Sequence, residues 1–162
     1  MKELFVDLHV HTNFSDSTFS PEEVIKVSRE EGLAAIGITD HDSIEALDII
    51  TALGEKAGLE IVPGVELSAE QDGREIHLLG YLISWQEAWF KEKMKKLTLA
   101  REERAKEIVR RLNALGLELS FEQVKQLSGE GSIGRLHIAR ALVEKKCVPD
   151  TVAAFRLYLG EG

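Results

Sequence analysis

Cysteine and long apolar runs are almost missing from this 162-residue sequence, and each shortage excludes a class of protein. The single cysteine, Cys147, has no partner for an internal disulfide, so a reducing cytoplasm is the expected compartment. No apolar run approaches the roughly 18 residues of a membrane-spanning helix. The first residues, Met1-Lys2-Glu3, include an acid and precede a strand-like run, which is not the pattern of a signal peptide.

Basic residues are scarce in the first half of the sequence, and the formal net charge is −8. Residues 1–90 hold 18 acidic and 5 basic residues, whereas residues 91–162 hold 10 acidic and 15 basic residues. An acidic segment suits cations and a basic one suits phosphates or other anions, although both could simply be solvated surfaces. The acidity argues against broad binding of duplex DNA, which requires a cationic surface.

Strand-like and helix-like segments alternate over the first half of the chain. Ser20 and Glu23 predict a helix start with a capping box, and Asp42 with Glu45 predicts a second helix start. Such alternation is the βαβ pattern of an α/β fold, so the first three strands are expected to be parallel. The predicted strands are residues 4–10, 33–39, 60–67 and 74–83, and the predicted helices are 20–31 and 42–58.

The second half of the chain has helical periodicity only. Apolar residues between Phe90 and Leu115 recur at spacings of three and four, which predicts an amphipathic helix of about 25 to 30 residues. Ser120 with Gln123 forms another capping box, and further helices are expected at 136–146 and 151–159, the last capped by Asp150. We therefore divide the chain into an α/β part, 1–84, and a helical domain, 85–162.

Two histidines near the N-terminus predict a metal site. His9 and His11 are two apart on a predicted strand, so their imidazoles project from the same side, and Asp16 follows closely. An isolated pair of this kind is weak evidence, because surface histidines are common. For Asp7 two interpretations stay open: an acid at the strand edge, or a carboxylate that orients a metal ligand by a hydrogen bond.

Further metal-binding side chains follow the later strands. His41, flanked by Asp40, ends the second strand, Glu66 ends the third, and His77 lies in the fourth. Ligands collect at the carboxyl ends of the strands in a parallel α/β sheet. Imidazole suits zinc, iron or manganese, carboxylates suit manganese or magnesium, and a mixed set favours several ions bridged by a carboxylate such as Glu66. Bridged ions supply hydroxide near neutral pH and clamp phosphoryl oxygens.

Four segments together resemble the successive motifs of the PHP family (polymerase and histidinol phosphatase). They are Asp7-Leu8-His9-Val10-His11-Thr12 with Ser15-Asp16, Ile38-Thr39-Asp40-His41-Asp42, Gly64-Val65-Glu66-Leu67-Ser68, and Ile76-His77-Leu78-Leu79-Gly80-Tyr81. The resemblance implies a distorted (β/α)7 barrel that hydrolyses phosphoesters with two or three divalent ions. It implies a metal-bound water as the attacking group, with no side chain assigned as base. The implied metal ligands are His9, His11, Asp16, His41, Glu66 and His77. Asp7 and Asp40 are our candidates for carboxylates that support these ligands.

The helical part resembles one subgroup of that family, the nucleoside 3′,5′-bisphosphate phosphatases, which include enzymes that trim RNA 5′ ends and which insert a small helical domain here. The segment from Gly134 to Arg140 is similar to a motif of this insertion. The resemblance assigns Arg135 and His137 to a substrate phosphate, and the free N–H groups of a helix N-terminus and a planar guanidinium suit that ligand.

Arg101 and Arg104 resemble a basic pair of the same subgroup, although a solvated helix face explains them equally well. The implied substrate is a nucleotide or short RNA. A histidinol-phosphate phosphatase and a polymerase-linked exonuclease are alternatives, and the helical insertion argues against both.

The family's later motifs, a further histidine and an Asp-x-His, are not found after His137, and Ser17 stands where the family commonly has glycine. The sequence therefore predicts an incomplete barrel, about half of one, with the helical insertion. Three explanations stay open: a fragment of a longer protein, a second chain such as a homodimer partner that supplies the rest, or a short variant that binds metal or nucleotide without efficient turnover. An open strand edge is a liability unless it is covered.

Overall fold

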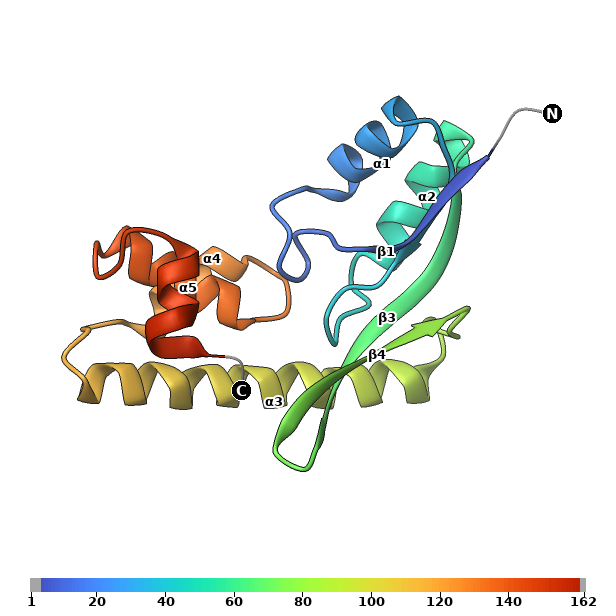
Figure 1. The fold of residues 1–162 in the computed structure, drawn as a ribbon. Coiled ribbons are helices and arrows are strands. Elements are labelled where there is room, and N and C mark those ends of the chain that lie inside the picture. Colours follow the sequence, from blue (N-terminus) through green and yellow to red (C-terminus); the bar gives the residue numbers. More distant parts are fainter. Residues whose placement is uncertain (1–3, 161–162) are drawn as a thin grey trace.

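A curled four-stranded sheet is the framework of the first half of the protein (Figure 1). The computed structural model describes residues 4–160. The prediction that Met1-Lys2-Glu3 does not begin a signal peptide concerns residues outside this range. The strands lie in the order β1-β2-β3-β4, and the first three are parallel as predicted, whereas β4 pairs with β3 in antiparallel orientation. Their bounds are β1 Phe5–Val10, β2 Leu33–Ile38, β3 Glu60–Gln71 and β4 Arg74–Tyr81.

Two helices, α1 (Pro21–Glu30) and α2 (Leu47–Ala57), pack against the first strands. The predicted capping box of α1 is confirmed, because the Ser20 hydroxyl accepts from the Glu23 N–H and the Glu23 carboxylate accepts from the Ser20 N–H. Burial of aliphatic side chains between helices and sheet is the main stabilising term for this half. The buried residues of this core include Val24, Ile36, Ile38, Leu47, Ile50 and Val65.

The predicted start of α2 at Asp42 is wrong. The helix begins at Leu47, five residues later, and its N-cap, Ala46, makes no side-chain cap. Asp42 has a left-handed backbone (φ 46°), and its carboxylate accepts from the guanidinium of Arg101 and the N–H of Ser68. The carboxylate of Asp42 therefore forms a long-range ion pair with Arg101 instead of capping a helix.

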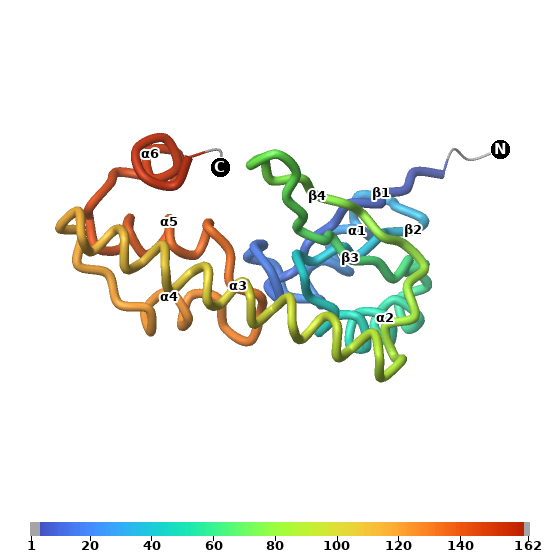
Figure 2. Tube along the Cα trace, turned by 90° about the horizontal axis from the view of Figure 1, so that it is seen from below, coloured from blue at the N-terminus to red at the C-terminus, as the bar shows by residue number. Residues whose placement is uncertain are grey.

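A single long helix, α3 (Ala88–Ala114), runs along both halves of the molecule (Figures 1 and 2). Its 27 residues agree with the predicted length. Met94 packs into the core of the α/β part, while Ala105 and Leu112 belong to a second hydrophobic cluster. Because one rigid element contributes to both cores, it fixes how the helical part sits relative to the sheet.

The second cluster is built from short helices packed on α3. The capping box at Ser120 is confirmed, and the Asp150 carboxylate accepts from the Ala153 N–H as expected of a cap. The division of the chain near residue 84 stays a prediction. The helices are α4 Phe121–Ser128, α5 Arg135–Glu144, α6 Thr151–Ala154 and a π-helical turn, Phe155–Leu159.

The β1 edge of the sheet pairs with no other strand among residues 4–160. Its side chains Phe5, Val6 and Leu8 are exposed, together with Leu4 just before the strand. Within the described range, no helix is both long and apolar enough to cross a membrane.

Candidate functional site

Four imidazoles from the sheet and the loops beside it form a row. His9 lies on β1 and His11 follows it, His41 comes three positions after the end of β2, and His77 lies on β4. Successive ring centroids are 5.0 Å, 4.8 Å and 4.8 Å apart in the order His9, His11, His41, His77. The strands therefore bring together four predicted metal ligands that span almost 70 positions of the sequence.

The carboxylate of Glu66 lies at the centre of this row and is buried. Its Oε2 atom is 3.0 Å from His9 Nε2 and 3.1 Å from His11 Nε2. Its Oε1 atom is 2.6 Å from His77 Nδ1, and His41 Nδ1 lies 3.6 Å from Oε2. Burial alone would raise the pKa of Glu66, but the hydrogen bond from His9 and the charges of the other histidines lower it overall.

Asp16 closes the row from the loop after β1. Its two oxygens lie 3.5 Å from His11 Nδ1 and 3.5 Å from His41 Nε2. Burial tends to raise the pKa of this carboxyl, but the hydrogen bond and charge of His41 outweigh it and lower the pKa to about 2. Asp16 is therefore ionised at neutral pH and available to a cation.

These six residues form three overlapping groups, each able to bind one metal ion. The ligand atoms within each group lie within 4.8 Å of one another. His41 Nδ1 is buried without a hydrogen-bond partner among the described residues, and an unpaired buried nitrogen is costly unless a cation or donor reaches it. The donor set thus suits divalent metals. The groups are His9-His11-Glu66, His11-Asp16-His41 and His41-Glu66-His77.

The two predicted supporting carboxylates differ in position. Asp40 is buried and accepts hydrogen bonds from the N–H and hydroxyl of Thr12 and from the hydroxyl of Ser15. Burial raises the pKa of Asp40, and these hydrogen bonds oppose the rise. Asp40 therefore anchors the loop that carries His11. Asp7 is exposed and accepts from the backbone N–H of His9.

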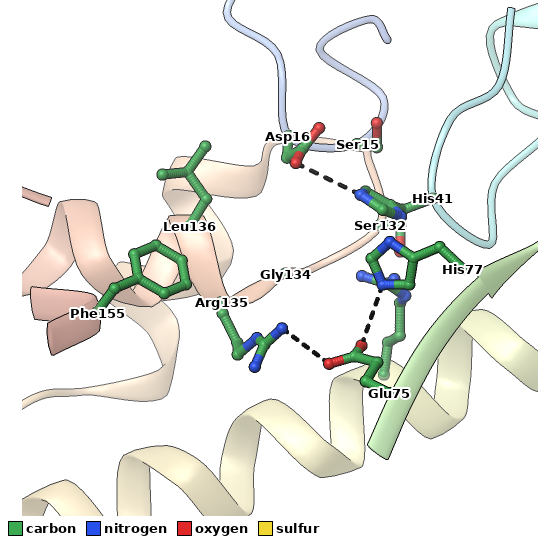
Figure 3. Close-up of a pocket in the computed structure, with 11 residues that line it drawn as sticks. Ser15, Asp16, His41, Glu75, His77, Ser132, Gly134, Arg135, Leu136 and Phe155 are labelled. Atoms are coloured by element: carbon green, nitrogen blue, oxygen red, sulfur yellow. Dashed lines mark hydrogen bonds and ion pairs between the residues drawn. The ribbon is translucent and has the colours of Figure 1, made fainter. Parts of the chain in front are cut away.

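A pocket of about 140 Å³ separates the metal-ligand row from the helical part (Figure 3). Arg135, at the start of α5, enters it and pairs with Glu75 of β4 at 2.8 Å. Arg101 also lines the pocket, but its guanidinium is bound to Asp42 and Ser68. The remaining lining residues are Ser15, Asp16, His41, His77, Ser132, Gly134, Leu136 and Phe155.

The other two predicted phosphate ligands do not line this pocket. Arg104 lies in an adjoining recess of about 40 Å³, 3.4 Å from Glu75. His137 is buried, and its Nδ1 accepts the Gly134 N–H at 3.0 Å. Burial, followed by the charge of Arg140, lowers the pKa of His137 to about 4. The structure thus places His137 beneath the start of α5, and its contact with a phosphate stays a prediction.

Sequence reasoning missed two residues of this region. Glu75 links Arg135 and His77, and strand parity could have found it, because it lies two positions before His77 on the same strand. Asp42 binds Arg101 from 59 positions away, and no local pattern indicates such a pair.

Comparison with known proteins gives concordant matches. The PHP domain family matches residues 7–152. A 5′-3′ exoribonuclease of Haemophilus influenzae is 32% identical over 156 residues, covering 96% of this chain and 57% of the relative. A 3′,5′-nucleoside bisphosphate phosphatase of Chromobacterium violaceum is 31% identical over 158 residues, covering 97% and 55%.

A solved structure from Bifidobacterium adolescentis, assigned as a metal-dependent phosphoesterase, superposes with a TM-score of 0.87 at 28% identity, covering 96% of this chain and 55% of that one. The chain spans little more than half the length of each of these three proteins.

Proposed function

The chain belongs to the PHP domain family, and from this premise we propose that it forms the metal-binding part of a hydrolase that cleaves phosphate esters of nucleotides. One observation carries the proposal: four imidazoles converge on the buried carboxylate of Glu66, next to a pocket that contains Arg135. Such a donor set suits cations, and the neighbouring guanidinium suits an anion. A phosphate ester can bind both the metal ions and the guanidinium of Arg135.

Two or three divalent ions are the proposed cofactors, held by the three overlapping ligand groups. Imidazole-rich groups favour manganese, zinc or iron, and the carboxylates also admit magnesium. Such ions, when bound, lower the pKa of water and offset the charge of phosphoryl oxygens. The protein's own part is to position: Asp40 holds the loop of His11 and Asp16, and Glu66 joins the groups. We assign no side chain as general base.

The proposed substrate is a nucleoside 3′,5′-bisphosphate or the 5′ end of a short RNA. The names of the Haemophilus and Chromobacterium relatives suggest these substrates, and both relatives match the helical part of this chain as well as the sheet. Arg135 would bind a substrate phosphate at the free N–H groups that begin α5. A family member acting on histidinol phosphate is the less favoured substrate assignment. The lone cysteine suits a cytoplasmic protein.

The exposed β1 edge supports a further proposal, that additional strands complete the barrel. Leu4, Phe5 and Val6 are all more than half exposed, and an open edge of this kind invites pairing. A further segment of chain, as the longer relatives suggest, is the proposed source, and a second copy is the alternative.

A non-catalytic module that binds metal or nucleotide is the second candidate function. It is supported by the three overlapping ligand groups, which offer donor atoms for metal ions whether or not turnover follows. On this view the metal groups bind ions but lack what turnover requires.

The test is phosphate release from adenosine 3′,5′-bisphosphate by the manganese-loaded protein. We expect the wild type to release phosphate. In His9→Ala the rate should fall about 100-fold or more, since the loss of a group that only orients a ligand already costs about 10–100-fold. Asn13→Ala, which changes an exposed neighbour outside the ligand groups, should keep the wild-type rate. Metal binding without release would favour the module. Release that persists after chelation, or in His9→Ala at the wild-type rate, would reject the proposed chemistry.

A further inference from the structure

Glu75 contacts both the metal-ligand row, at His77, and two of the candidate phosphate-binding arginines, Arg104 and Arg135. It lies on β4 two positions before His77, so both side chains extend from one face of the strand. Its Oε2 is 2.8 Å from Arg135 Nη2. Its Oε1 is 3.4 Å from Arg104 Nη1 and 3.4 Å from His77 Nε2. Figure 3 shows it between Arg135 and His77.

A carboxylate bound to a guanidinium occupies the donors that a phosphate would use, because both anions accept the same N–H groups of the fork. The third guanidinium nearby, that of Arg101, is already bound by Asp42 and Ser68, and its side chain is only 11% exposed. The side chain of Arg135 is 30% exposed. An entering anion can therefore reach Arg135, but it must compete with Glu75.

We propose that Glu75 is an internal competitor of the substrate phosphate, which holds Arg135 in position and releases it when a phosphate binds. This rests on the proposed function, since it takes Arg135 as a phosphate-binding residue. Neutral polar ligands pair with arginine more weakly than a carboxylate does, so competition with Glu75 at Arg135 Nη2 favours anionic groups. The same competition lowers the affinity of Arg135 for a product that still carries a phosphate. Glu75 thus determines both the class of ligand and the ease of its release.

The chain provides a matched control for the charge of Glu75. Glu70 lies directly opposite Glu75 in the β3–β4 ladder and is exposed. Glu70 makes no ion pair with any residue between 4 and 160. Glu70→Gln therefore removes the same charge from the same hairpin and leaves Arg135 paired.

The test measures anion affinity at Arg135 directly. Inorganic sulfate, a tetrahedral dianion that is not hydrolysed, is titrated into the chain loaded with diamagnetic zinc, and the Nε–H resonance of Arg135 is followed by NMR. Arg135→Lys identifies that resonance by removing it. Losing a partly exposed carboxylate competitor is worth about 1 kcal/mol, so Glu75→Gln should bind sulfate about fivefold more tightly. Glu70→Gln should match the wild type.

Equal affinity in Glu75→Gln and wild type would overturn the proposal, and so would equal tightening in Glu70→Gln, because the effect would then be one of net charge. Glu75→Asp keeps the charge but shortens the reach to Arg135. It should give an intermediate affinity, and it replaces Glu75→Gln if that variant does not fold. Sulfate binding does not require turnover. A fivefold effect without hydrolysis of the bisphosphate would therefore reject the proposed function alone, and hydrolysis without the effect would reject this inference alone.

Discussion

Replacing Asp40 by alanine should destabilise the protein by about 3 kcal/mol, because three donors lose their acceptor. Asp40 is 1% exposed, and it accepts from the Thr12 N–H at 2.7 Å, the Thr12 hydroxyl at 2.6 Å and the Ser15 hydroxyl at 2.5 Å. Each buried donor left unpaired costs about 1–3 kcal/mol. The hydroxyls can turn to other acceptors, such as His11 Nδ1 at 3.3 Å from Ser15, and burying the carboxylate has its own cost. Both effects keep the expected loss of stability near the low end of the range that three unpaired donors would give.

Urea denaturation of the metal-free chain measures this loss. Asp40→Asn retains one carbonyl acceptor and should lose less, about 1–2 kcal/mol. Asp7→Ala, which removes an exposed carboxylate from β1, should stay within about 0.5 kcal/mol of the wild type. Since Asp40 orders the loop of His11 and Asp16, manganese affinity should also fall about 10-fold or more in Asp40→Ala. A stability loss below about 1 kcal/mol would refute the reasoning.

Three further predictions concern pH, packing and metal. His137 has a pKa of about 4 when folded against 6.5 when unfolded, so the unfolded chain takes up the proton first. Stability should fall from about pH 6.5 to about pH 4 by up to about 3 kcal/mol more than in His137→Gln, measured by urea midpoints across that range. Gly37→Ala places a Cβ 2.6 Å from the Leu8 carbonyl oxygen, whereas Gly80→Ala meets nothing nearer than 3.7 Å. Thermal melts should show a loss of about 1–3 kcal/mol in the first only, and equal melting temperatures would contradict this. Manganese at about 100 times its Kd should add about 2.7 kcal/mol of stability, removed again by a chelator; a melting temperature unaffected by both would contradict metal binding to the folded state.

Local signals predicted most of the elements. The capping boxes at Ser20 and Ser120 marked two helix starts correctly, because each is completed within four residues of the chain. Strand parity placed His9 and His11 on one side, and the βαβ pattern predicted parallel strands that bring His41 beside them. These features depend on spacing alone, which the sequence contains.

Features that depend on distant partners were not predictable in this way. Asp42 has the sequence context of a helix cap, yet Arg101, 59 positions away, binds its carboxylate and the helix begins later. His137 carries the resemblance to a phosphate ligand, and its hydrogen bond to Gly134 is local, but the burial of its ring to 1% exposure follows from how α5 packs. Side-chain pairing between the two halves is decided by tertiary packing, and no periodicity in the sequence encodes it.

The continuity of α3 means that the two halves share a helical register. Met94 packs into one core and Ala105 into the other, so the residues between them act as a fixed spacer. Inserting one residue between Met94 and Arg101 would turn Arg101 and everything beyond it by about 100° and advance it by about 1.5 Å relative to the sheet. Each core could still form, but Arg135 would no longer face the histidines. The length of this spacer is therefore as specific as the identity of the residues it brings together.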